Sequence, residues 1–216
     1  MYNAYMTQPK IHSYKYQNVT ISGLPGGGST TLLKLLKEEL GLDGWRGYSG
    51  GEFMRAYALE KELFDPTTGF HHAATDYEDD FDRKIDMGVR EKLQAEKKWI
   101  LEAWLSGFLA QGIDGILKIL VFCSNDAVRI DRVVNRDGVS IAEAKQHIIE
   151  RYKKNLEKWS RMYGREWHEW VVKAGIVGEG EPIDFWNPNL YDVVIDTYAT
   201  NKEDTLKIVL NAITQK

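Results

Sequence analysis

The stretch Asn18-Val-Thr-Ile-Ser-Gly-Leu-Pro-Gly-Gly-Gly-Ser-Thr-Thr31 decides the fold. Its first five residues alternate apolar and polar and are rich in β-branched side chains, which predicts a strand. The next six residues contain four glycines and a proline, so they cannot form regular structure. Leucines then recur at helical spacing over residues 29–40, and Gly41 predicts the end of that helix. The stretch is therefore a strand, a glycine loop and a helix.

The loop has the spacing of a phosphate-binding loop, which is Gly, four residues, Gly, Lys, then Ser or Thr. Only the lysine is missing, because Ser29 stands in its place. Curled glycine backbone and a helix N-terminus still direct N–H groups at an anion, and the Thr30 hydroxyl suits magnesium. Arginines from another segment, or Lys34 one turn later, are candidates for the missing cation. A glycine-rich turn without a ligand is the alternative. The candidate phosphate-binding residues are Gly23, Gly26, Gly27, Gly28, Ser29, Thr30 and Thr31.

Three more apolar runs, at 99–103, 115–122 and 192–196, alternate with helical patterns. Continuous apolar runs of this kind predict buried parallel strands in an α/β sheet. The expected helices cover about 52–64, 77–97, 140–163 and 201–213, and the third begins with the capping-box pair Ser140 and Glu143. The stretch 164–190 contains three tryptophans and is interpreted as an insertion with a helix and a loop.

Composition narrows the class of protein. The 216 residues are 43% hydrophobic and 28% charged, which is typical of a folded chain with one large domain. With a net charge of −4, we do not expect the protein to bind nucleic acids in general. A single cysteine, Cys123, permits neither an internal disulfide nor a cysteine-based zinc site, and we expect it in a strand. Without a long apolar run or a signal-peptide pattern, we expect a cytoplasmic protein with no membrane partner.

Five segments resemble, in order, those of P-loop nucleoside monophosphate kinases, most closely the short archaeal-type cytidylate kinases. The glycine-loop stretch is the first, and Tyr48-Ser-Gly-Gly-Glu-Phe-Met-Arg55 is similar to the family's S-A-G-D-x-F-R. Ile100-Leu-Glu-Ala-Trp-Leu-Ser-Gly107 is similar to V-L-E-G-R-L-A-G. Leu117-Lys-Ile, with Val128-Arg-Ile-Asp-Arg132 and Asn135-Arg-Asp-Gly138, resembles the fourth strand and the segment after it. Tyr191-Asp-Val-Val-Ile-Asp-Thr197 resembles Y-D-L-V-I-D-T.

This resemblance implies a P-loop NTPase fold, with a five-stranded parallel sheet flanked by helices. An arm is expected over 1–17, followed by a single domain over 18–216. Within that domain, we expect acceptor-binding helices over about 48–98 and a lid over about 129–163. The Trp-rich insertion covers 164–190. The implied reaction is transfer of the γ-phosphoryl group of ATP to a nucleoside monophosphate with Mg²⁺, and CMP or dCMP is the favoured acceptor.

The resemblance also implies roles for individual side chains. Arg129 would stack on adenine and Arg132 would face the phosphates, while Arg136 and Arg151 bracket a turn where the lid would close. Ser49, Gly51 and Arg55 would bind the acceptor, with Arg55 on its phosphate. Glu102 would orient the magnesium ion together with Thr30. Asp82 or Asp86 would accept from the cytosine amine. Residues 129–161 contain nine Lys or Arg and five Asp or Glu, although a solvated helix face remains the alternative for each residue.

Two departures from the family pattern leave other functions open. Ser29 replaces the loop lysine, and Trp104 replaces an arginine expected to help bind the acceptor. A nucleotide-binding sensor that has lost phosphoryl transfer is one alternative, and a kinase for another small acceptor is the second. Either a monomer or a homodimer is compatible with the sequence. The histidines lack zinc-helix spacing, and no Gly-x-Ser-x-Gly elbow is present.

Overall fold

The fold centres on a five-stranded parallel sheet with the strand order β2-β3-β1-β4-β5. The structure is a computed structural model that describes residues 13–60 and 79–214. The strands are β1 (Asn18–Gly23), β2 (Arg46–Ser49), β3 (Trp99–Glu102), β4 (Ile116–Phe122) and β5 (Val193–Asp196). The expected α/β sheet is confirmed. Residues 1–12 of the expected arm, and 61–78 of the expected acceptor helices, lie outside the described residues.

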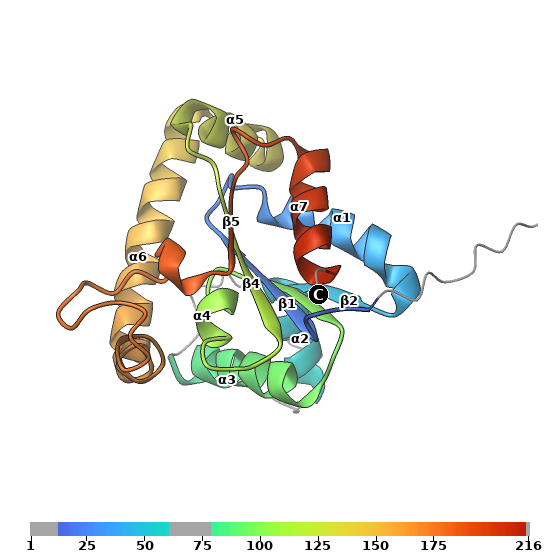
Figure 1. Cartoon of the computed structure of the whole chain (residues 1–216). Helices are drawn as coiled ribbons and strands as arrows, with labels where there is room; N and C mark the ends of the chain where they lie inside the picture. The colour runs from blue at the N-terminus through green and yellow to red at the C-terminus, as the bar shows by residue number, and fades with distance from the viewer. Residues whose placement is uncertain (1–12, 61–78, 215–216) are drawn as a thin grey trace, which may run out of the picture.

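Helices cover both faces of this sheet (Figure 1). They are α1 (Ser29–Leu40), α2 (Gly50–Glu60), α3 (Asp79–Ala95), α4 (Ser106–Leu109), α5 (Asp126–Asp137), α6 (Ile141–Trp167) and α7 (Lys202–Thr214). A π-helical turn, His168–Val172, follows α6 directly, and two 3₁₀ turns lie at Gly41–Asp43 and Pro188–Leu190. None of the helices within the described ranges is both long and apolar enough to cross a bilayer.

The pleat of the strands divides the core into two layers. Successive side chains of a strand point to opposite faces of a sheet. Val19 and Ile21 of β1, with Ile119 of β4, therefore pack under α1 and α7, which lie side by side in Figure 1. Leu101 of β3 and Leu120 of β4 face the other way, into an aromatic core with α3, α4 and the segment after α6. Because both faces are covered, the whole of β1 is buried, including its polar residues Asn18, Thr20 and Ser22.

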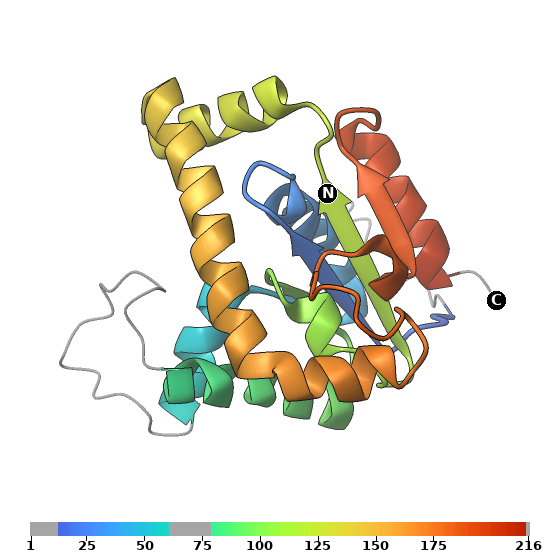
Figure 2. The same ribbon diagram turned by 90° about the vertical axis from the view of Figure 1, so that its left-hand side faces the viewer.

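Helices α5 and α6 continue from the carboxyl end of β4 and leave the sheet (Figure 2). The capping box is present, because the Ser140 and Glu143 side chains each bond the other's backbone N–H. Figure 2 shows the long α6 running from α5 down to α3. Its backbone leaves helical geometry at Tyr163, where φ is −119°. Helix α6, which is kinked at Tyr163, thus connects the expected lid with the expected acceptor helix.

Some elements differ from the sequence expectation. The edge strand β2 and the short helix α4 were not predicted as separate elements, since four residues carry too little periodicity. Cys123 was expected within a strand, but it is buried just beyond the end of β4. Residues 164–167 continue α6, and Trp167 is buried against Phe108 at a ring distance of 6.1 Å.

Gly107 provides a test of the packing in the aromatic core. A Cβ at this position would lie 2.3 Å from the Cε1 atom of Tyr191, whose ring is buried and whose hydroxyl donates to Phe185. Gly107→Ala should therefore lower the free energy of unfolding by about 1–3 kcal/mol, as overpacking does. Urea unfolding measures this change.

Gly164→Ala is the matched control, because a Cβ at this helical position meets no atom within 4 Å. It should be neutral or raise the free energy of unfolding by up to about 1 kcal/mol. Equal effects of the two substitutions would contradict the packing described for Tyr191.

Candidate active site

The glycine loop has the backbone shape that the sequence predicts. Gly26 and Gly28 have φ values of 78° and 100°, a region that L side chains rarely adopt, and Gly28 is the N-cap of α1. A Cβ on Gly28 would lie 3.3 Å from Cγ2 of Thr197. The loop therefore needs glycine at these positions both for conformation and for space.

The carbonyl oxygens of loop residues 24–28 are all bound by the protein itself. Gly27 N–H donates to Leu24 O, and the Arg129 Nε–H donates to Pro25 O at 2.8 Å. Arg132 donates to Gly26 O, and the Thr197 hydroxyl donates to Gly27 O. Leu32 N–H donates to Gly28 O, which is the first hydrogen bond of α1. Because these carbonyl oxygens bond other parts of the protein, the loop is compatible with N–H groups directed at an anion in the cavity.

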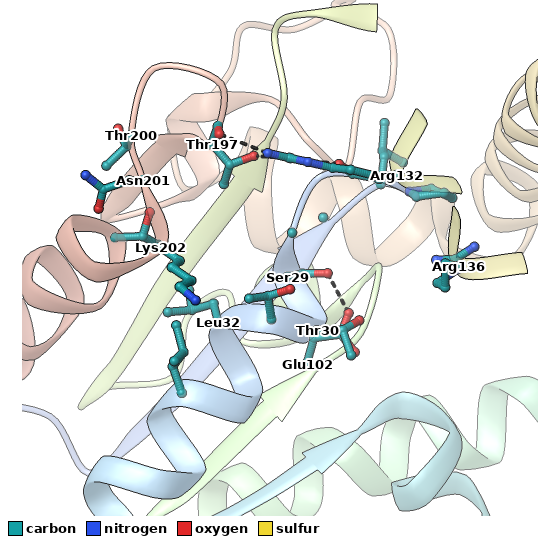
Figure 3. Close-up of a pocket in the computed structure, with 18 of the residues that line it drawn as sticks. Ser29, Thr30, Leu32, Glu102, Arg132, Arg136, Thr197, Thr200, Asn201 and Lys202 are labelled. Atoms are coloured by element: carbon teal, nitrogen blue, oxygen red, sulfur yellow. Dashed lines mark hydrogen bonds between the residues drawn. The ribbon is translucent and has the colours of Figure 1, made fainter. Parts of the chain in front are cut away.

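A cavity of about 640 Å³ lies over the loop at the carboxyl end of the sheet. Figure 3 shows that its walls come from the loop, the end of β3, helix α5 and the start of α7. Ligands in open parallel sheets bind at this edge. The predicted site residues that line the cavity are Gly23, Gly26, Gly28, Ser29, Thr30, Thr31, Glu102, Arg132 and Arg136.

Ser29 binds the carboxylate that ends β3. Its hydroxyl donates to Oε1 of Glu102 at 2.7 Å (Figure 3). Burial raises the pKa of Glu102, and the nearby Glu52 carboxylate adds to this, while the Ser29 bond and the charge of Arg136 oppose it. A neutral donor therefore occupies the position where a lysine would place a cation. This leaves the carboxylate without a lysine partner from the loop.

Thr30 and Glu102 offer the kind of oxygen atoms that suit magnesium. Both residues line the cavity, on the side where phosphates would meet the loop. Magnesium sites commonly use one or two carboxylates, with waters and substrate phosphates completing the shell. Among the described residues, no group of three or more His, Cys, Asp or Glu side chains is arranged to hold a metal ion. The residues present fit a phosphate-assisted magnesium site.

The predicted arginines divide into two groups. Arg129 and Arg132 bind the loop backbone, and Arg132 also donates to the Thr197 hydroxyl at 2.7 Å. Arg136 instead forms a two-bond ion pair with Asp137, at 2.6 and 2.8 Å. The guanidinium of Arg151 lies over the Trp104 ring, 5.4 Å from its centre.

Two lysines near the loop differ in position. Lys34 lines a separate, shallower hollow with Thr30, Ser49 and Glu52, so it does not line the main cavity. Lys202, which the sequence did not single out, lines that cavity at the start of α7. Figure 3 shows its side chain directed towards α1. Its place just after the last strand is the signal that could have identified it.

The predicted acceptor residues lie at the end of β2 and on α2 and α3. Ser49 accepts from Glu52 N–H and caps α2, Gly51 is in the first turn, and Arg55 is further along α2 with its side chain outside the described residues. Asp82 pairs with Lys158 at 2.6 Å, and the Asp86 carboxylate accepts from the Tyr163 hydroxyl at 2.6 Å. Burial raises the pKa of Asp86 to about 7. Both acids therefore already have partners on α6.

Comparisons with known proteins identify relatives of this chain. A family model described as an AAA domain matches residues 19–149. The cytidylate kinase of Methanosarcina barkeri is 32% identical over 196 residues, which cover 90% of this chain and 95% of that protein. The cytidylate kinase of Methanopyrus kandleri is 32% identical over 203 residues, covering 90% and 92%. A solved structure of an uncharacterized Eubacterium ventriosum protein is 15% identical, covers 93% of this chain and 99% of that chain, and has a TM-score of 0.60, which supports the fold alone.

Gly28→Val should abolish most binding of ATP. The side chain would meet Thr197, would be strained at a φ of 100°, and would block access to the loop N–H groups. Since charge-assisted hydrogen bonds contribute roughly 1.5–3 kcal/mol each, we expect the affinity to fall by at least about 100-fold in calorimetry.

Gly41→Val, at the other end of α1, is the control. A Cβ on Gly41 meets no atom within 4 Å, so ATP affinity should not change. Tight ATP binding by the Gly28 variant would show that the loop does not hold the phosphates.

Asp86 should make stability depend on pH. Its pKa is raised to about 7 in the folded chain, against about 3.9 in an unfolded one. The folded state therefore retains a proton that the unfolded state releases, so this stabilisation is complete below about pH 4 and is lost as the pH rises through about 7. Because of Asp86, the free energy of unfolding of the wild type should fall by on the order of 2 kcal/mol between pH 5 and pH 8. The Asp86→Asn variant should not show this fall.

Urea unfolding at both pH values tests this, with Asp80→Asn, an exposed position on the same helix, as the control. An Asp86→Asn protein that loses as much stability as the Asp80→Asn control over this pH range would contradict the burial of Asp86.

Proposed function

The chain belongs to the archaeal-type cytidylate kinase family of P-loop nucleoside monophosphate kinases, and from this we propose that it transfers the γ-phosphoryl group of ATP to CMP or dCMP. The observation that carries the proposal is the shared cavity of the glycine loop, Glu102 and the α5 arginines. A phosphate loop alone would also fit a binding protein. A carboxylate and cations facing the same space supply what phosphoryl transfer needs.

The work of such a site is positioning and charge neutralisation, because the reaction needs little covalent help. The loop N–H groups and the N-terminus of α1 would hold the β- and γ-phosphates. Arg132 and Arg136 line the same space and would face the phosphates. Arg129, bonded to Pro25 beside the loop, would pack against adenine.

A magnesium ion would be held by the Thr30 hydroxyl and, through water, by Glu102. When bound, it supplies positive charge to the phosphate oxygens that become more negative during transfer. Ser29 orients the Glu102 carboxylate through its 2.7 Å hydrogen bond. The raised pKa of Glu102 would fall again as cations gather beside it.

The acceptor would lie between α2 and α3. The start of α2, with Ser49, Gly51 and Arg55, would bind its phosphate. Asp82 and Asp86 would bind the cytosine amine, which donates hydrogen bonds that carboxylates accept. Because both acids bond α6 through Lys158 and Tyr163, binding of the acceptor would also change the contacts that hold α6.

The second candidate is a nucleotide-binding protein without transfer activity. The observation that favours it is Ser29, which leaves the loop without its own cation. It predicts ATP binding with no consumption of any monophosphate.

Product analysis separates the two functions. The purified chain is incubated with ATP, Mg²⁺ and each nucleoside monophosphate in turn, and the products are separated by chromatography. We expect CDP and dCDP to form faster than any other diphosphate. If no monophosphate is consumed while calorimetry still detects ATP binding, the kinase proposal is wrong and the binding protein is favoured.

Ser29→Lys should raise ATP affinity. The new ammonium group would lie beside Glu102, where it restores a cation at the phosphates. One charge-assisted hydrogen bond corresponds to roughly 1.5–3 kcal/mol, so we expect a gain of about 10-fold or more in calorimetry. Ser29→Ala, which only removes the hydroxyl, should give no such gain. A Ser29→Lys protein with weaker ATP binding than the wild type would contradict a cation deficit at this position.

A further inference from the structure

Trp104 lies at the edge of the proposed reaction centre. It follows Glu102 by two residues, where the polypeptide leaves β3, and its side chain is half-buried. Trp159 and Trp186 pack against it nearly edge-on, at 5.7 and 6.0 Å between ring centres. Rings on two sides therefore restrict the orientation of the Trp104 indole.

The guanidinium of Arg151 lies over this ring, 5.4 Å from its centre. This is within the range of a cation–π contact, and tryptophan is the strongest aromatic partner for it. Within the part of the chain that the structure describes, Arg151 forms no ion pair, and its exposed guanidinium lies over the Trp104 ring instead. An arginine side chain loses substantial rotamer freedom when it is held in place, and the ring supplies a surface that favours one orientation.

Asp137 connects Arg151 to the cavity. Its carboxylate forms the two-bond ion pair with Arg136, and the positive charge of Arg151 adds to that pair in lowering the pKa of Asp137. Arg136 lines the cavity with Glu102 and interacts with it electrostatically. Trp104 and Arg151 do not line the cavity themselves, but the charge of Arg151 acts on Asp137, which holds Arg136 at the cavity wall.

We propose that Trp104 is a positioning residue for phosphoryl transfer, which holds the guanidinium of Arg151 near the Arg136–Asp137 pair, so that α6 adds positive charge beside Arg136. This inference rests on the proposed function. A second arginine at position 104 would repel Arg151, whereas an indole ring attracts it. The tryptophan is thereby matched to the arginine on α6.

A double-mutant cycle measures the proposed dependence. Arg151→Ala should lower kcat about 100-fold, the scale of losing one donor at developing charge. Trp104→Ala should lower kcat about 10-fold when Arg151 is present and less than about 2-fold when it is absent. Trp104→Phe keeps an aromatic face and should retain most of the activity.

Trp45→Ala is the control, because Trp45 is buried in the core layer on the other face of the sheet, where it packs against Tyr14. Its effect on kcat should be the same factor with and without Arg151, even where its melting temperature falls as far as that of the Trp104 variants. If Trp104→Ala also lowers kcat by one constant factor, Trp104 is only a packing residue and the inference is wrong.

Failure of the inference is distinguishable from failure of the proposed function. If the wild type forms diphosphate and the Trp104–Arg151 cycle shows no coupling, only the inference fails. If the wild type consumes no monophosphate, the proposed function fails, and the same four proteins are compared by calorimetric ATP affinity. Coupling above about 3-fold in affinity would then support the positioning role towards bound phosphate, and coupling below that would overturn it.

Discussion

The binding of the loop carbonyls by other segments is the constraint on which the site depends. Backbone N–H groups converge on an anion more readily when the carbonyls between them are directed elsewhere and have partners there. Here Arg129, Arg132 and Thr197 supply those partners at Pro25, Gly26 and Gly27. These side chains come from α5 and from the end of β5, so the loop, the helix after β4 and the last strand form one bonded unit.

This bonded unit explains how positive charge is distributed around the cavity. The two arginines nearest the loop are engaged by its backbone, and the serine in the lysine position binds Glu102 instead of a ligand. Positive charge that is not committed to the loop lies further out, on Arg136 and Arg151, and on Lys202 at the start of α7. At the kink in α6, the Tyr163 hydroxyl donates a hydrogen bond to the Asp86 carboxylate and so connects α6 to α3. The helix α6, which we propose as the lid, is thereby bonded directly to α3, which we propose as part of the acceptor site.

The sequence was sufficient for the features that are local. The strand, glycine loop and helix, the apolar runs of β3, β4 and β5, and the capping box at Ser140 all depend on residues within a few positions of one another. β2 was not identified, because Arg46 and Gly47 give a four-residue edge strand no apolar alternation. Contacts over long separations were also out of reach. Ser29 meets Glu102 across 73 positions and Arg132 meets Gly26 across 106, and no spacing rule encodes such pairs. Residue types suggested that Arg129 and Arg132 gather near phosphates, but only the fold shows that they bind the loop itself.

A crystal structure with CMP, Mg²⁺ and a non-hydrolysable ATP analogue would test the central claim most directly. The account predicts the triphosphate on the glycine loop, with γ-phosphate oxygens within about 3.2 Å of loop N–H groups and of a guanidinium from Arg136 or Arg151. CMP should lie between α2 and α3. A triphosphate bound away from the loop, or a γ-phosphate that meets no arginine while CMP is in place, would contradict the account.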